Sequence, residues 1–243
     1  MTDSNRPKPV SDLQQAAQST AQANTAPPPV RHRRTIIFQA ALIASLGLFG
    51  ALAVLASGAA YFPIDLTITQ ALQGLRSPVF HALMVAVSWL GYMPQAAFTL
   101  LLPAAVAWWL GYRWEAKMIV LSTAAVVRVN VIVKTLVNRP RPASTLVEVY
   151  TTLSTHSFPS GHVMFAVGLF GFLLFLAFTL MRPSWLRVTL IVLFAMLIAL
   201  TGLSRIYLGE HWASDVLGAY LLGMPGLAAA VAVYQAGKRR GAA

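Results

Sequence analysis

The chain contains no cysteine among its 243 residues and only seven acidic residues. Without cysteine, the protein cannot form a disulfide, use a thiol nucleophile or bind zinc through thiolates. The shortage of Asp and Glu leaves few oxygen ligands for a divalent cation. The chain also lacks internal repeats and any polar segment large enough for a soluble domain.

Apolar surface and positive charge dominate the composition. Hydrophobic residues make up 57% of the chain and charged residues 10%, with a mean hydropathy of +0.66, which is typical of a polytopic membrane protein. The net charge of +11 comes mostly from short Lys and Arg clusters beside apolar runs. Such clusters set membrane topology and contact anionic headgroups. We therefore expect the lipid bilayer, and no nucleic acid, as a partner.

The N-terminal residues 1–34 are rich in Gln, Ala, Ser, Thr and Pro and have no periodic apolar face, which predicts a disordered polar tail. A basic cluster at the end of this tail precedes the apolar run 35–57. This run is longer than the hydrophobic part of most signal peptides, so a retained signal-anchor helix is favoured over a cleavable signal. Residues 35–235 are predicted to form the membrane domain, and 236–243 a basic C-terminal tail.

Basic residues flank the apolar runs at four places: the N-terminal tail, the loop with Arg113 and Lys117, the turn with Arg182 and Arg187, and the C-terminus. If all four are cytoplasmic, both termini lie inside and the number of spans is even. Of seven apolar stretches, 79–93 is the weakest. Together with 64–76, we predict that it forms an interfacial or re-entrant helical segment on the outer side.

The predicted fold is therefore an all-α, polytopic membrane bundle. Its six transmembrane helices are expected at 35–57, 95–112, 118–137, 161–181, 188–204 and 212–234.

Three polar clusters adjoin these apolar stretches, and the predicted topology places all of them on the outer face. They are Lys134-x6-Arg141-Pro142, Pro159-Ser160-Gly161-His162 and Ser204-Arg205-x5-His211-x3-Asp215. The cations Lys134, Arg139, Arg141 and Arg205 thus lie on the side that the positive-inside bias depletes. Polar groups at this depth are costly and usually functional, and an anionic ligand would account for the cations.

In the first cluster, a guanidinium can bind phosphate oxygens in bidentate fashion and an ammonium adds a point charge. The alternative for Lys134 and Arg141 is a pair of snorkelling interfacial cations. In the second cluster, Ser160 is expected near a helix N-cap, and Gly161 allows a close backbone approach. The N–H groups at such a helix start favour an anion. His162, on the first turn, would face the same ligand or serve a structural role.

The third cluster places His211 and Asp215 four residues apart, which predicts one shared helix face. A carboxylate at that spacing can accept the Nδ1–H of the imidazole and leave Nε2 free to attack. Arg205, across a short turn, is expected to reach the same phosphate.

These motifs resemble the signature of the type 2 phosphatidic acid phosphatase family, whose site is shared with vanadium haloperoxidases, bacterial class A acid phosphatases and glucose-6-phosphatase. That signature reads K-x6-RP, PSGH and SR-x5-H-x3-D, and all eleven specified residues occur here in order, between residues 134 and 215. The resemblance to its six-span membrane branch covers about 35–235. It implies an integral membrane phosphatase that uses no metal or other cofactor.

By residue, the resemblance implies that His211 attacks phosphorus, that Asp215 orients it, and that His162 protonates the leaving oxygen. The phosphate oxygens would be bound by Lys134, Arg141, Arg205, Ser160 and Gly161. The expected substrates are undecaprenyl diphosphate, phosphatidic acid or phosphatidylglycerol phosphate, and the motifs do not choose among them. The expected location is a bacterial inner membrane, with the site toward the periplasm.

Four other functions stay open at this point. A metallohydrolase would use His162, His211, Glu210 and Asp215 as ligands, although three nearby cations oppose a divalent ion. The same anion site could hold vanadate for oxidation chemistry. A phosphotransferase or a non-enzymatic lipid transporter could use the same bundle.

Two features of the sequence fall outside the motifs. Arg128 lies in the middle of a predicted span, where it is expected to line the lipid cavity or to pair with backbone carbonyls and Asn130. The segment 143–158 is longer than a simple connection and is expected to act as a lid or as a solvated outer loop.

Overall fold

The computed structural model describes residues 28–241, and every regular element in that range is helical. The eight helices described are α2 (Pro28–Ser57), α3 (Pro63–Gln73), α4 (Pro78–Trp89), α5 (Gln95–Trp109), α6 (Arg113–Val137), α7 (Gly161–Leu180), α8 (Trp185–Tyr207) and α9 (Ala213–Gly241). Residues 44–241 form one packed unit, distinct from residues up to 43. The contacts described below all lie within this unit.

Five of the described helices are long and apolar enough to cross a membrane. They are the helical segments His32–Ser57, Arg113–Val137, Gly161–Leu180, Trp185–Tyr207 and Ala213–Arg240. The remaining predicted span, 95–112, corresponds to α5, which has only 15 residues. The helix stops at Trp109 because Gly111, at a φ of 87°, turns the chain before Arg113. The all-helical bundle is thus confirmed, with five candidate spans among the described residues, whereas a sixth span at α5 stays a prediction.

The helix boundaries differ from the prediction at both ends of the chain. Helix α2 begins at Pro28 rather than at residue 35, so the end of the predicted tail is helical, while residues 1–27 lie outside the described residues. Helix α9 continues to Gly241, through most of the segment predicted as a basic tail. Lys238, within that segment, pairs with Glu115 at 2.6 Å, which ties the last turns of α9 to the start of α6.

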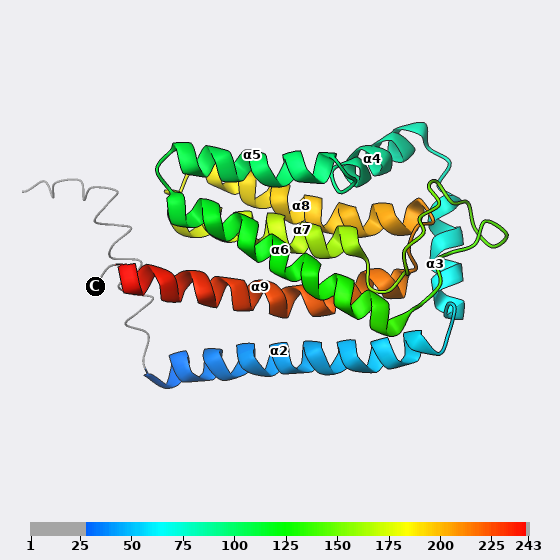
Figure 1. Cartoon of the computed structure of the whole chain (residues 1–243), viewed down its shortest axis with the longest axis horizontal. Coiled ribbons are helices and arrows are strands. Elements are labelled where there is room, and N and C mark those ends of the chain that lie inside the picture. The colour runs from blue at the N-terminus through cyan, green and yellow to red at the C-terminus, as the bar shows by residue number, and fades with distance from the viewer. Residues whose placement is uncertain (1–27, 242–243) are drawn as a thin grey trace, which may run out of the picture. The chain divides into compact units, whose positions relative to one another are not determined.

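Helix α7 is the centre of the packed unit. Figure 1 shows α5 to α9 running side by side, and α7 packs against α6, α8 and α9. Its sequence is apolar on every face, as expected for a helix that is covered on several sides. Val163, Leu169 and Phe172 on α7 are 0% exposed.

The three polar clusters meet at one end of this bundle, where α6 and α8 end and α7 and α9 begin. Helix α3 crosses the bundle at that end, and the long connection 138–160 lies beside it (Figure 1). The weak apolar segments 64–76 and 79–93 form the separate short helices α3 and α4. Their position relative to a membrane remains a prediction.

The opposite end of the bundle carries the basic residues at the start of α6 and at the end of α9. Trp114 Nε1, at the start of α6, donates to the carbonyl of Tyr234 on α9 at 3.2 Å. This contact, like the Glu115–Lys238 pair, places the start of α6 beside the end of α9. Arg113 and the basic end of α9 are therefore separated from the polar clusters by the length of the helices.

Candidate active site

Lys134 lies in the last turn of α6, which ends where Asn138 adopts a left-handed conformation with a φ of 53°. Its Nζ donates to the carbonyl oxygens of His156 at 2.6 Å and Ser157 at 3.1 Å. The ammonium group is therefore held by the end of the long loop, next to the second polar cluster.

The second cluster begins α7, as the sequence predicts, with Ser160 at the N-cap. The Asn130 amide donates to the Pro159 carbonyl at 3.0 Å, and the Ser160 N–H donates to the Asp215 carbonyl at 3.1 Å. The helix start is thus tied to both α6 and α9. The Ser160 hydroxyl makes no capping bond and remains available to a ligand.

The third cluster contains a tight turn after α8. The Arg205 carbonyl accepts from the N–H groups of Glu210 at 3.1 Å and His211 at 3.2 Å, so the chain folds back on itself. Gly209 has a φ of 64° in this turn, and a Cβ there would collide with the Glu148 carbonyl. His211 consequently precedes α9, which begins at Ala213, and the prediction that it shares a helix face with Asp215 is wrong.

The His211 ring contacts a different partner on each nitrogen. Nε2 lies 3.2 Å from Nη1 of Arg141, while Nδ1 lies 3.4 Å from the Ser157 hydroxyl and 3.5 Å from Oδ2 of Asp215. Because arginine can only donate, Nε2 must present its lone pair and the ring proton is on Nδ1. This assignment from the hydrogen-bond partners gives the tautomer that a nucleophilic Nε2 requires.

The surroundings of His211 also keep its ring neutral. Its side chain is 1% exposed. Burial lowers the pKa of His211 well below 6.5, and the positive charges of Lys134, Arg141 and Arg205 lower it further. The imidazole therefore keeps a free lone pair under mildly acidic conditions.

Arg141 is held beside His211 by the backbone. Its Nη1 donates to the Glu210 carbonyl at 2.6 Å, and Nε donates to the Thr155 carbonyl at 2.7 Å. Nη2 donates to the Thr155 hydroxyl at 2.9 Å. Arg141, a predicted phosphate ligand, is thus attached both to the long loop and to the turn that carries His211.

Arg205 is fully buried, and three neighbours fix its position. Its guanidinium forms an ion pair with Glu210 and donates to the Ser88 hydroxyl and to Tyr92 Oη, the latter at 3.0 Å. The hydroxyl of Tyr92 in turn donates to Glu210. The Tyr92 ring packs edge-on against the His162 ring, and the two ring centroids are 4.7 Å apart. The end of α4 and the turn after it therefore support both Arg205 and the predicted acid, His162.

Four buried side-chain atoms in the described part of the chain lack a hydrogen-bond partner. Three belong to predicted site residues, Ser160 Oγ, His162 Nε2 and Arg205 Nε, and the fourth is Trp212 Nε1. A buried polar group without a partner is costly, and all three site atoms can donate to an oxyanion. The arrangement can bind a tetrahedral anion beside Nε2 of His211.

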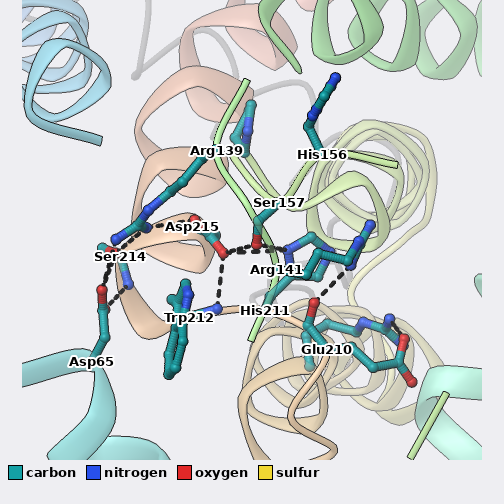
Figure 2. Close-up of polar contacts among 12 residues, drawn as sticks. Asp65, Arg139, Arg141, His156, Ser157, Glu210, His211, Trp212, Ser214 and Asp215 are labelled. Atoms are coloured by element: carbon teal, nitrogen blue, oxygen red, sulfur yellow. Dashed lines mark hydrogen bonds and ion pairs between the residues drawn. The ribbon is translucent and has the colours of Figure 1, made fainter. Parts of the chain in front are cut away.

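Asp215 is held by partners that the motif does not contain. Figure 2 shows its carboxylate between Arg139 on one side and Ser157 on the other. Arg139 Nη1 donates to Oδ1 at 2.7 Å, while the Ser157 hydroxyl and the Trp212 N–H donate to Oδ2, the second of these at 2.8 Å. In the sequence, Arg139 stands out only as an additional cation, whereas nothing distinguishes Ser157 and Tyr92 from ordinary loop residues.

In the described part of the chain, the four residues considered as metal ligands do not form one ligand group. Glu210 faces Arg205, Asp215 faces Arg139, and among residues 32–241 no group of three His, Asp or Glu side chains could hold a metal ion.

The expectations for Arg128 also need correction. Its side chain is exposed on α6, and Asn130, its suggested partner, instead binds the Pro159 carbonyl, because helical periodicity turns the two residues to different faces.

The segment 143–158 is held against its neighbours along its length. The Glu148 carbonyl accepts from Gln73 Nε2 on α3 at 2.7 Å, and the Tyr150 N–H donates to the Leu208 carbonyl at 2.9 Å. Its last residues provide the carbonyls that hold Lys134 and Arg141. This segment is therefore part of the framework of the site; whether it also closes over a ligand stays a prediction.

Comparisons with known proteins agree on one protein family. Residues 115–240 match the model of the PAP2 superfamily. The chain is 31% identical over 167 residues to phosphatidylglycerophosphatase B of Bacillus subtilis (strain 168), a match that covers 66% of this chain and 78% of the relative.

Two solved structures share the fold. One is a transmembrane PAP2-type phosphatidylglycerolphosphate phosphatase from Bacillus subtilis, with a TM-score of 0.69 and 23% identity over 80% of this chain and 96% of that one. The other is Aquifex aeolicus LpxE, with a TM-score of 0.51 and 25% identity over 69% and 94% of the two chains.

Proposed function

Because the chain belongs to the PAP2 superfamily and is a membrane phosphatase, we propose that it removes a terminal phosphate from a lipid phosphate or diphosphate through a covalent intermediate on His211. The observation that carries this proposal is the environment of the His211 ring. Its Nε2 lone pair faces Arg141 at 3.2 Å, and its Nδ1 faces Asp215 and Ser157. A neutral imidazole held in this tautomer is a nucleophile next to an anion site.

In the first step, Nε2 of His211 attacks phosphorus, and the bond from phosphorus to the lipid oxygen breaks. His162 donates a proton to that oxygen, so the lipid leaves as an alcohol or a monophosphate. Asp215 stabilises the charge that develops on the imidazole. In the second step, water attacks phosphorus, His162 takes a proton from the water, and the N–P bond breaks to release phosphate.

The phosphate oxygens bear most of the charge in the transition state, and three cations stabilise that charge. Lys134, Arg141 and Arg205 are held in place by carbonyls and side chains before the substrate binds. Such preorganised donors stabilise a transition state without reorganisation at the moment of reaction. The Ser160 hydroxyl and the N–H of Gly161, at the start of α7, add further donors. No step in this scheme requires a metal ion.

A lipid substrate also fits the apolar surface next to the site. A groove of about 540 Å³ lies between α6 and α9, lined by apolar side chains such as Val126, Val129 and Leu222. It includes Met164, near the start of α7, which begins at the polar end of the bundle. Acyl or prenyl chains in this groove would leave the phosphate at the polar end of the bundle. The relatives named for phosphatidylglycerophosphate make that lipid the first substrate to test.

The membrane helices and the bacterial relatives indicate a multi-pass protein of a bacterial inner membrane. We place the site on the outer face and both termini inside, because the basic start of α6 and the basic end of α9 lie at the opposite end of the bundle. Helix α5 serves as the sixth span in this topology. Its 15 residues extend for about 22 Å at 1.5 Å per residue, which a locally thinned bilayer accommodates.

The proposal is tested by phosphate release from phosphatidylglycerophosphate, phosphatidic acid and undecaprenyl diphosphate, with purified protein in detergent and EDTA. Turnover that persists in EDTA and vanishes in His211→Ala supports a metal-independent phosphatase, and the ranking of rates names the substrate. Turnover abolished by EDTA, or retained in His211→Ala, overturns the mechanism. Transfer of phosphate to an added alcohol instead of water would identify a phosphotransferase.

A further inference from the structure

Asp65 is a buried carboxylate that belongs to none of the three motifs. It lies in the first turn of α3 and accepts four hydrogen bonds. The N–H groups of Ser214 and Phe62 donate at 2.8 Å and 3.0 Å, the Ser214 hydroxyl at 2.7 Å and Arg139 Nη2 at 3.0 Å. Its neighbours are all donors, so the site requires an ionised acceptor at this position.

Arg139 connects Asp65 to the predicted catalytic carboxylate. Its two terminal nitrogens reach one carboxylate each, Nη2 to Asp65 at 3.0 Å and Nη1 to Asp215 at 2.7 Å. Nη1 also donates to the Ser214 hydroxyl at 2.7 Å, and Nε donates to the Ala59 carbonyl at 3.1 Å. All three charged side chains are at most 1% exposed, and Figure 2 shows them in one continuous chain of contacts.

The charges of this group have a chemical consequence. A buried carboxylate needs a counter-charge, and Asp215 has Arg139. If Arg139 faced Asp215 alone, however, it would cancel the negative charge that His211 needs when its ring becomes cationic. Asp65 restores that charge, because two carboxylates and one guanidinium carry a net charge of −1. The fork of the guanidinium also fixes the position of the Asp215 carboxylate beside Nδ1.

We propose that Asp65 and Arg139 are positioning residues for catalysis, which together hold the Asp215 carboxylate in place behind His211. Neither residue touches the phosphate site directly, so they act on the chemical step and not on phosphate binding. This inference rests on the proposed function of His211 as the nucleophile. It adds two residues, one of them from α3, to the machinery of the reaction.

The test compares Asp65→Asn, Arg139→Lys and Arg139→Gln in steady-state assays with the best lipid substrate. Asp65→Asn is expected to lower kcat by about 10- to 100-fold, the scale seen when a metal-bound group loses its outer hydrogen-bond partner, with KM changed less than about 3-fold. Arg139→Gln should lower kcat further. Arg139→Lys should recover part of that loss, since it restores the charge without the fork.

A double-mutant cycle separates positioning from general stability. Asp215→Asn alone is expected to lower kcat by on the order of 10³- to 10⁴-fold, as for other carboxylates that orient a catalytic histidine. Once that carboxylate is neutral, adding Asp65→Asn should cost less than about 3-fold more. Glu115→Gln is the matched control, because Glu115 is also buried and ion-paired but lies at the other end of the bundle.

The outcomes distinguish this inference from the proposed function. Loss of activity in His211→Ala, with normal kcat in Asp65→Asn, would refute the role of the pair and leave the nucleophile in place. Additive losses in the double mutant, or a loss of melting temperature with unchanged kcat, would also refute it. Full activity in His211→Ala would instead remove the proposed function itself.

Discussion

Glu210 offers a test in which stability and ligand affinity should change in opposite directions. Its carboxylate forms an ion pair with Arg205, and both side chains are 0% exposed. Replacing it with Gln keeps an acceptor for the guanidinium but removes the negative charge. Loss of one partner of a buried ion pair should destabilise the protein by about 3 kcal/mol.

The same substitution should strengthen anion binding. With one guanidinium between them, the Glu210 carboxylate and a phosphate bound by Arg205 would be roughly 7 Å apart, and two unit charges repel by about 2 kcal/mol at that distance and an effective dielectric constant of about 20. Removing this repulsion corresponds to about 30-fold tighter binding. Glu210→Gln should therefore lower the melting temperature in detergent and also lower the inhibition constant of orthovanadate, a phosphate-shaped anion.

Glu115→Gln again provides the control, because it removes a buried ion pair far from the site. It should lower the melting temperature and leave vanadate inhibition unchanged. An inhibition constant for Glu210→Gln that is equal to or higher than that of the wild type, in a protein that still melts cooperatively, would refute this account of Arg205.

Three further predictions concern the nucleophile and the groups that place it. Burial and neighbouring cations lower the pKa of His211 well below 6.5, so its neutral form persists at lower pH. The acid limb of the pH profile of kcat/KM should therefore have its midpoint below pH 6.5. A midpoint above 6.5 would contradict the buried, cation-surrounded ring. Gly209→Ala should cost about 1–3 kcal/mol of stability and lower kcat, since its φ of 64° and the Glu148 carbonyl leave no room for a side chain; an unchanged thermal melt would refute this. Tyr92→Phe keeps the ring against His162 but loses the hydrogen bonds to charged groups, so kcat/KM should fall about 10-fold. Tyr92→Leu also removes the ring, and a loss equal to that of Tyr92→Phe would contradict a role for the ring.

Much of the fold could be predicted from the lengths of the apolar runs and from the basic residues between them. The run 161–181 matches α7, and 188–204 lies within α8, because buried and lipid-facing helices need long apolar stretches. The helix expected at 95–112 is shorter than predicted. Apolar residues continue to Leu110, and hydropathy does not register the turn that Gly111 imposes.

The site was predictable to the extent that it depends on fixed spacing. Ser160 lies at the N-cap position of α7 as expected, and His211 is adjacent to Arg141 and Asp215. The partners from other parts of the chain were not predictable, because their contacts depend on how the helices pack. Asp65 meets Ser214 across 149 positions, and a single sequence carries no signal for such a pairing.

The position of His211 relative to α9 illustrates a second limit. A spacing of four residues suggested one helical face, but the turn after α8 occupies that stretch and the helix begins at Ala213. Asp215 still reaches the ring because its carboxylate accepts the Trp212 N–H at 2.8 Å, which fixes the chain just before the helix. The same residues come together as predicted, through a different local structure.

The most direct test of the central claim is to trap the covalent intermediate. Protein mixed with a ³²P-labelled lipid phosphate should be quenched in alkali within the first turnover and mapped by mass spectrometry, with His211→Ala as the control. The account predicts a phosphoryl group on His211 that is stable in alkali, labile in acid and absent from the variant. Label on a different residue, or label that the variant retains, would contradict the assignment of His211 as the nucleophile.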